Sequence, residues 1–198
     1  MQTFYLQITR GSHAIRHHHY EAAVPTVFAR LQKVVQRDLS HGISAIVIPD
    51  QRGMNADIKG LNRLGNVLMS QEAHHAGAEE AIVFQGGLVS EGATSNVFMV
   101  KQGEVLTPPK SAHLLSGITR DVVIEVAGQV GVNVQEKEIT VSELYDADEV
   151  WIASTSRGLA PVIVLGDKLV GSGEVGAVYK TVHAAYQTKL QIWLGTVA

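Results

Sequence analysis

The sequence predicts an α+β fold, because strand-like and helix-like segments are mixed without a strict strand–helix alternation. Several short apolar stretches are rich in β-branched residues, as strands are, whereas residues 61–73 and 118–130 carry apolar side chains at helical spacing. The chain has 198 residues, of which 45% are hydrophobic and 18% are charged. This composition is typical of a globular protein, and the length suffices for one large domain or for one domain plus part of another.

The strand pattern begins close to the first residue and recurs along the whole chain. Residues 24–34 fit either a strand or a helix, and we favour a strand. Gly86-Gly87 and Gln102-Gly103 each separate two apolar runs and indicate hairpins. The expected strands are residues 3–9, 24–34, 42–50, 81–85, 88–90, 96–100, 104–107, 132–139, 149–155 and 161–165.

Helices are expected where the apolar spacing changes to three and four residues. The first has its apolar face at Leu61, Leu64, Leu68, Met69 and Ala73 and ends at Gly77.

The second helix spans about residues 118–130, with Val122, Val123, Val126 and Val130 on one face and Gly131 just after its end. Thr140 and Glu143 have the spacing of a capping box for a short helix. A last helix is expected over about residues 173–193.

Composition excludes several classes of function. The formal net charge is -3, so no general basic field indicates nucleic acid or an anionic membrane as a partner. The chain has no cysteine, which excludes disulfides, thiolate catalysis and cysteine-based zinc sites. No apolar run has the length of a membrane span, and the first residues lack the pattern of a signal peptide. We therefore expect a cytoplasmic protein.

The stretch RGSHAIRHHHY (10–20) is unusual, because it holds four histidines and two arginines. It fits a metal site, a purification tag or a cationic site for an anionic substrate. Adjacent histidines cannot easily all face one ion, and no nearby carboxylate completes a ligand set, so we expect no metal. His74 and His75 lie away from the apolar face of the first helix and are expected to be solvated.

Four separated motifs carry a family resemblance: DIKGLNRL (57–64), QEAHHAG (71–77), EGATSNVF (91–98) and GITR (117–120). Together they resemble the fold-type IV pyridoxal-phosphate enzymes, the class IV aminotransferase family, and are most similar to its D-amino acid aminotransferases. The resemblance runs from about Phe4 to about Tyr186. It implies a D-amino acid aminotransferase-like fold and transfer of an amino group from a D-amino acid to a 2-oxo acid. It also implies a homodimer with pyridoxal 5′-phosphate as cofactor.

The resemblance assigns the cofactor residues. Lys59 becomes the Schiff-base lysine and proton shuttle, and Glu91 keeps the ring nitrogen of the cofactor protonated. Taken alone, Lys59 would be a solvated surface residue, and Glu91 would be a turn residue before Gly92. Asn96 is expected to shape the loop rather than to touch the substrate. Arg52 is carried over as a neighbour of the phenolic oxygen of the cofactor.

The phosphate of the cofactor is assigned to two places in the chain. Ile118 and Thr119 lie at the start of a helix, where backbone amides and a hydroxyl suit an anion, although ordinary capping by Ser116 or Thr119 has the same signature. Thr155 and Ser154 form the second hydroxyl cluster, and Leu115 is included among the cofactor-binding residues. Arg157 replaces a small polar residue of relatives; it is an extra cation near the site or, as we favour, a solvated side chain.

The histidine-rich loop corresponds to the loop that binds the substrate carboxylate in D-amino acid enzymes and is thought to reach across a dimer interface. The resemblance assigns this role to Arg16 and His18, with His17 or His19 as the alternative partner, since the loop is one residue longer than expected. Family sequence on both sides of the loop argues against a tag. Leu64 stands where branched-chain enzymes have a tyrosine, which favours the D-amino acid type.

Family members extend further towards the N-terminus. We therefore expect residues 1–38 to be the remnant of a small N-terminal domain with the substrate loop, and residues 39–198 to be the pyridoxal-phosphate-binding domain. The first strand then belongs to a sheet whose earlier strands are absent, in a fragment, a shortened member or one of two polypeptides. The alternatives for function are an aminodeoxychorismate lyase, a branched-chain aminotransferase, a truncated non-catalytic member and a histidine-rich metal-binding protein.

Overall fold

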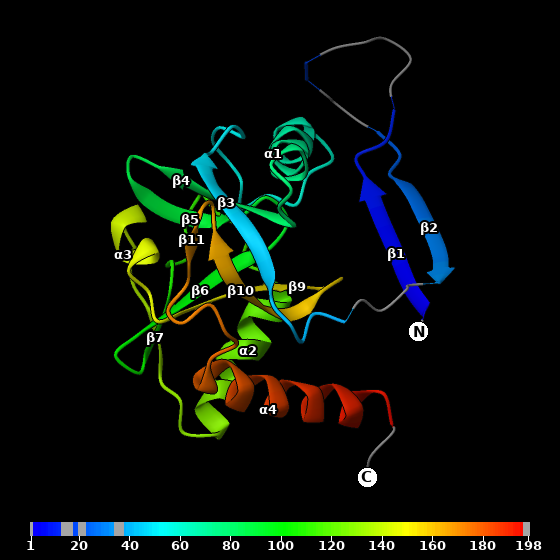
Figure 1. Ribbon diagram of the computed structural model, residues 1–198. Coiled ribbons are helices and arrows are strands. Elements are labelled where there is room, and N and C mark those ends of the chain that lie inside the picture. Colours follow the sequence, from blue (N-terminus) through cyan, green and yellow to red (C-terminus); the bar gives the residue numbers. More distant parts are fainter. Residues whose placement is uncertain (1, 13–17, 20–22, 34–37, 196–198) are drawn as a thin grey trace. The chain divides into compact units, whose positions relative to one another are not determined.

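The computed structural model describes residues 2–12, 18–19, 23–33 and 38–195. The chain divides into two compact units, Met1–Arg37 and Asp38–Ala198 (Figure 1). The first unit is an antiparallel ribbon of β1 (Gln2–Thr9) and β2 (Thr26–Lys33). Both expected strands are confirmed, and β1 finds its pairing partner in β2. Large apolar side chains such as Phe4 and Ile8 stay exposed, because a two-stranded ribbon buries little surface of its own.

The second unit is built on a mixed nine-stranded sheet, counted over the described residues. The order of its main path is β5-β4-β3-β10-β9-β6-β7-β8, and β11 pairs with β10. The pairs β3–β4, β3–β10 and β7–β8 are parallel, and the others are antiparallel. The strands are β3 (Ile43–Pro49), β4 (Glu80–Gln85), β5 (Leu88–Gly92), β6 (Asn96–Lys101), β7 (Glu104–Thr107), β8 (Val134–Glu136), β9 (Glu149–Ser154), β10 (Gly158–Leu165) and β11 (Lys168–Leu169).

Both faces of this sheet are buried, because successive side chains of β6 belong alternately to two hydrophobic clusters. Val97 and Met99 belong to one hydrophobic cluster, and Phe98 and Val100 belong to another. The first cluster collects side chains from β3, β4, β5, β6, β7, β9 and β10. Strands at both ends of the sheet can reach one cluster only if the sheet curls around it. The expectation of an α+β fold is thus confirmed.

Helices cover the outer surface of the curled sheet. Figure 1 shows α2 (Ile118–Gln129) beside α4 (Ala177–Trp193), and both pack on the second cluster. The helix α1 (Leu64–His75) packs on a third cluster next to β3 and β4 through Met69 and Ala73. The short α3 (Val141–Tyr145) begins with the predicted capping box of Thr140 and Glu143.

Several sequence-based boundaries are wrong. The first helix begins at Leu64 instead of Leu61, because Leu61 lies in a turn whose carbonyl accepts from the backbone N–H of Arg63. Leu64 and Leu68 are exposed, as is Val130 at the end of α2, so helical spacing overstated the buried faces. The last helix begins at Ala177 instead of Gly173.

The strand expected over residues 132–139 is confirmed only for Val134–Glu136. Beyond it the chain leaves β7 and turns to the opposite edge of the sheet, where the Ile139 carbonyl accepts a hydrogen bond from Val89 in β5. The curling of the sheet therefore shortens β8.

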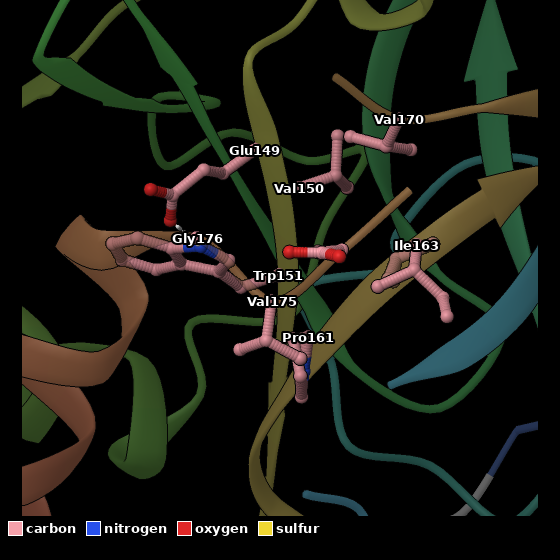
Figure 2. A pocket seen from close by; sticks show the side chains of 10 residues that line it. Glu149, Val150, Trp151, Pro161, Ile163, Val170, Val175 and Gly176 are labelled. Atoms are coloured by element: carbon pink, nitrogen blue, oxygen red, sulfur yellow. Dashed lines mark hydrogen bonds between the residues drawn. The ribbon is translucent and has the colours of Figure 1, made fainter. Parts of the chain in front are cut away.

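A carboxylate from the sheet caps α4. Glu149, in β9, accepts hydrogen bonds from the backbone N–H groups of Val178 (3.0 Å) and Tyr179 (2.8 Å) and from the Trp151 indole (3.0 Å). Figure 2 shows the Glu149 carboxylate directed at the Trp151 indole, with a dashed line for their hydrogen bond. A Cβ at Gly176 would lie 1.9 Å from the carboxyl carbon, so the approach requires glycine. The cap therefore fixes α4 on the sheet.

We expect Glu149→Ala to lower the free energy of unfolding by about 2 kcal/mol, because it leaves two helix N–H groups and an indole without their acceptor. Urea denaturation followed by circular dichroism measures the change. Glu125→Ala is the control, since Glu125 contacts Lys189 and Gln129 near the surface and its loss should cost less than about 1 kcal/mol. Equal losses in the two variants would show that Glu149 acts as an ordinary surface carboxylate.

Candidate active site

A buried carboxylate is the centre of the candidate site. Glu91 is 4% exposed and lies in β5, so the interpretation as a turn residue is wrong. Its carboxylate pairs with the Arg52 guanidinium and accepts hydrogen bonds from the backbone N–H of Leu115 (3.1 Å) and from Asn96 Nδ2 (3.2 Å). Three segments far apart in sequence therefore meet at Glu91.

Asn96 connects this carboxylate to the segment before α2. Its Nδ2 also donates to the Leu115 carbonyl at 2.8 Å. A Cβ at Gly117 would lie 2.2 Å from Asn96 Oδ1, so glycine permits the close approach. These contacts agree with the prediction that Asn96 shapes the loop.

The first turn of α2 leaves its backbone N–H groups available. The N-cap is Gly117, and no side chain of the described residues caps the helix, so the alternative of capping by Ser116 or Thr119 is wrong. Ile118 is exposed and Thr119 is half-buried. Unpaired N–H groups at a helix N-terminus, with the dipole behind them, form a binding site for an anion such as phosphate.

Arg120 fixes this turn and was not among the residues predicted for the site. It is 1% exposed, donates to the Pro108 carbonyl at 3.0 Å and pairs with Glu136 at 3.0 Å. Its place in the GITR motif, directly after Thr119, is the sequence feature that could have indicated it.

The second hydroxyl cluster lies at the end of β9. Ala153 pairs with Asn96 across the sheet, so Ser154 and Thr155 follow at the edge where the Glu91 segment turns into β6. Ser154 is half-buried and Thr155 is exposed. The register of β9 against β6 therefore brings Glu91 and these hydroxyls to one edge of the sheet.

Arg157, in the same turn, is not the solvated side chain that we favoured. Its Nη1 lies 2.7 Å from the buried carboxylate of Glu80, and its Nη2 donates to the Glu79 carbonyl at 2.8 Å. The buried carboxylate of Glu80 on β4, which no sequence motif indicated, holds the arginine in place.

Lys59 lies in the segment between β3 and α1, and its side chain is exposed. The segment is tied to the approach to α2, because the Ala56 N–H donates to the Ala112 carbonyl (2.9 Å) and Arg52 Nη2 donates to the His113 carbonyl (3.2 Å). Within the part of the chain that the structure describes, the Lys59 amine makes no hydrogen bond or ion pair. No partner among these residues therefore occupies the amine, as a lysine that forms a covalent bond requires.

Electrostatics at the centre is dominated by burial. Removal from water raises the pKa of Glu91 to about 7, although Arg52 acts in the opposite direction. The pKa of Arg52 is raised by Asp50 and Glu91 despite its burial, so it stays charged. Asp50 holds Arg52 at 2.6 Å, although its place in the sequence indicated only the end of a strand.

The residues expected to bind the substrate carboxylate belong to the first unit. Arg16 and His17 lie outside the described residues. His18 is exposed, and His74 and His75 are exposed at the end of α1, as expected for that pair. No group of three or more potential metal ligands occurs among the described residues.

The helices of the described chain include none with the length and apolar character needed to cross a membrane.

Comparison with known proteins shows consistent similarities. The model of the family "amino-transferase class IV" matches residues 2–164. The chain is 40% identical over 189 residues to D-alanine aminotransferase of Bacillus licheniformis, covering 94% of this chain and 66% of the relative. Among solved structures, branched-chain amino acid aminotransferase of Escherichia coli has a TM-score of 0.85 and 30% identity, covering 93% of this chain and 64% of that one.

An aminotransferase from Brucella abortus bound to the cofactor PLP has a TM-score of 0.77 and 28% identity, covering 85% of this chain and 62% of that one. The chain thus spans about two thirds of the length of the relatives it matches. The family model covers most of the chain, and the chain belongs to the class IV aminotransferase family.

Proposed function

We propose that this chain is the cofactor-binding part of a pyridoxal-phosphate-dependent aminotransferase that acts on a D-amino acid and a 2-oxo acid. The observation that carries the proposal is the buried Glu91 carboxylate, held by Asn96 and Leu115 beside the start of α2. The 40% identity to a D-alanine aminotransferase supports the substrate class.

The residues fit the cofactor. The uncapped N-terminus of α2 at Ile118 and Thr119, together with the hydroxyls of Ser154 and Thr155, suits a phosphate group. Glu91 suits a protonated ring nitrogen, because a buried carboxylate stabilises a nearby positive charge.

Lys59 supplies an amine for covalent attachment and for proton transfer. Leu115 fixes the Glu91 carboxylate through its N–H, and Arg52 would lie on the side of the phenolic oxygen. When bound, pyridoxal phosphate supplies an electron sink for the transfer of the amino group.

The division at Arg37 supports separate roles for the two units. In this proposal residues 39–198 bind the cofactor, and residues 1–38 belong to the small domain whose loop offers Arg16 and His18 to the substrate carboxylate. A guanidinium fork matches a carboxylate well. The proposal includes a cytoplasmic homodimer; exposed Leu64, Val67 and Leu68 on α1 are the kind of apolar surface that an interface covers.

A branched-chain aminotransferase is the second candidate, favoured by the similarity to the Escherichia coli enzyme. The 40% identity to a D-alanine aminotransferase, against 30% for that structure, favours the D-amino acid. We expect transamination with D-alanine to exceed transamination with L-leucine at least tenfold in an assay of 2-oxo acid formation. A preference for L-leucine would support the second candidate.

We expect pyridoxal phosphate to give a near-visible absorption band with this chain, and borohydride to fix the cofactor on Lys59, as peptide mass mapping detects. Lys59→Ala should abolish the band and the adduct, because Lys59 is the lysine of the segment between β3 and α1, whose Arg52 pairs with Glu91. Lys168→Ala is the control, because Lys168 lies on β11 and its amine lies over the ring of Tyr145. Adducts spread over surface lysines, or an unchanged band in Lys59→Ala, would contradict the proposal.

We expect the free energy of unfolding of the cofactor-free chain to fall as pH rises from about 4.5 to about 7. In this range folded Glu91 keeps a proton that the unfolded chain has lost, because burial raises its pKa from 4.5 to about 7. The shift corresponds to about 3 kcal/mol. Urea denaturation at several pH values should show this component lost in Glu91→Gln and kept in Glu125→Gln; identical pH profiles for all three would refute it.

A further inference from the structure

A second buried carboxylate lies outside the Glu91 cluster. Glu80, in β4, is 2% exposed. Its Oε2 accepts hydrogen bonds from Arg157 Nη1 (2.7 Å) and Ser95 Oγ (2.8 Å), and its Oε1 accepts from the backbone N–H of Ala81 (3.0 Å). One carboxylate therefore holds two separate turns.

The first of these turns is residues 154–157. Arg157 closes it through its own backbone N–H, which donates to Ser154 Oγ at 3.3 Å. Both terminal nitrogens of its guanidinium already have acceptors, at Glu80 and at the Glu79 carbonyl. The charge of Arg157 is thus matched inside the protein, and the arginine fixes the turn on β4 instead of serving as a ligand for an anion.

The second turn is residues 92–95, between Glu91 and Asn96. A Cβ at Gly92 would lie 2.2 Å from Ser95 Oγ and 3.2 Å from the carboxyl carbon of Glu80, so this turn lies directly on the Glu80 carboxylate. Thr94 adds a long contact to Glu80 Oε2 at 3.5 Å. The turn that follows Glu91 and the turn that carries Ser154 and Thr155 therefore have one common support.

We propose that Arg157 and Glu80 form a positioning pair that places the hydroxyls of Ser154 and Thr155 for the phosphate of the cofactor. The inference rests on the proposed function. Hydroxyl donors contribute to binding only within narrow limits of distance and angle. Thr155 and Ser156 are exposed, so packing gives the turn little further constraint, and the arginine fork supplies it.

A purely stabilising role would predict a different result. Buried ion pairs often add little net stability, whereas removal of one partner leaves an uncompensated charge. A general loss of stability would weaken the binding of every ligand alike. If the pair has a positioning role, its loss should weaken the binding of a ligand that carries the phosphate and leave the binding of a ligand without the phosphate unchanged.

The test compares the dissociation constants of pyridoxal phosphate and of pyridoxal, which lacks the phosphate, for wild type and Arg157→Ala. We expect pyridoxal phosphate to bind about tenfold more weakly to the variant, equivalent to about 1.4 kcal/mol, while pyridoxal binding changes less than about twofold. The dissociation constant of pyridoxal phosphate for Arg157→Lys should lie between those of wild type and Arg157→Ala, because an ammonium cannot make both contacts of the guanidinium. Lys189→Ala is the matched control, since its side chain is 25% exposed against 26% for Arg157 and it also pairs with a glutamate.

Glu80→Gln provides the second variant, because it keeps the size of the side chain while it removes the charge that pairs with Arg157; pyridoxal phosphate should again bind more weakly and pyridoxal should be little affected. Thermal unfolding without cofactor shows that each variant is folded before binding is measured. Equal weakening for both ligands, or no change in Arg157→Ala and Glu80→Gln, overturns the positioning role while the proposed function stands. A wild-type chain that binds pyridoxal phosphate no better than pyridoxal overturns the phosphate site itself, and the positioning pair with it.

Discussion

The burial of the Glu91 carboxylate is the constraint on which the rest of the site depends. A carboxylate taken out of water needs donors, and here they come from Arg52, Asn96 and the backbone of Leu115. Each donor belongs to a different segment of the chain. The requirement to satisfy one buried group therefore fixes the segment before Lys59, the start of β6 and the approach to α2 against one another.

The curled sheet explains why these segments meet at one edge. β4 and β6 are not neighbours in the sheet, yet the turn from β5 into β6 connects the two sides of the curl, and β9 lies next to β6. Some side chains at this edge are buried, and others are exposed. The buried carboxylates of Glu80 and Glu91 each pair with an arginine, whereas the hydroxyls of the β9–β10 turn remain available to a ligand.

Much of the fold could be predicted from local sequence, because strands with β-branched residues and glycine turns follow short-range rules. Gly86-Gly87 has positive φ at both residues, as a tight hairpin requires, and the capping box at Thr140 is present. The predictions were wrong where tertiary structure determines the length or the burial of an element. The curl of the sheet ends β8 early, and Leu64 fits the helical spacing of apolar residues but stays exposed. In the site, motifs indicated Glu91 and Asn96, but the pairing of Glu80 with Arg157 joins residues 77 positions apart, which no spacing rule contains.

In the proposed function, the two units have separate roles: one binds the cofactor and the other binds the substrate carboxylate. Every hydrogen bond that organises the Glu91 cluster and the Glu80 pair lies within Asp38–Ala198, whereas His18 belongs to the other unit. In the proposed function, binding of the cofactor therefore depends on contacts inside one unit. Selection between the two enantiomers of a substrate requires a group that holds the carboxylate on one side, and the proposal assigns that group to the ribbon unit. A change in the ribbon should then alter the choice of substrate without altering the affinity for the cofactor, whereas a change at Glu80 or Arg157 should do the reverse.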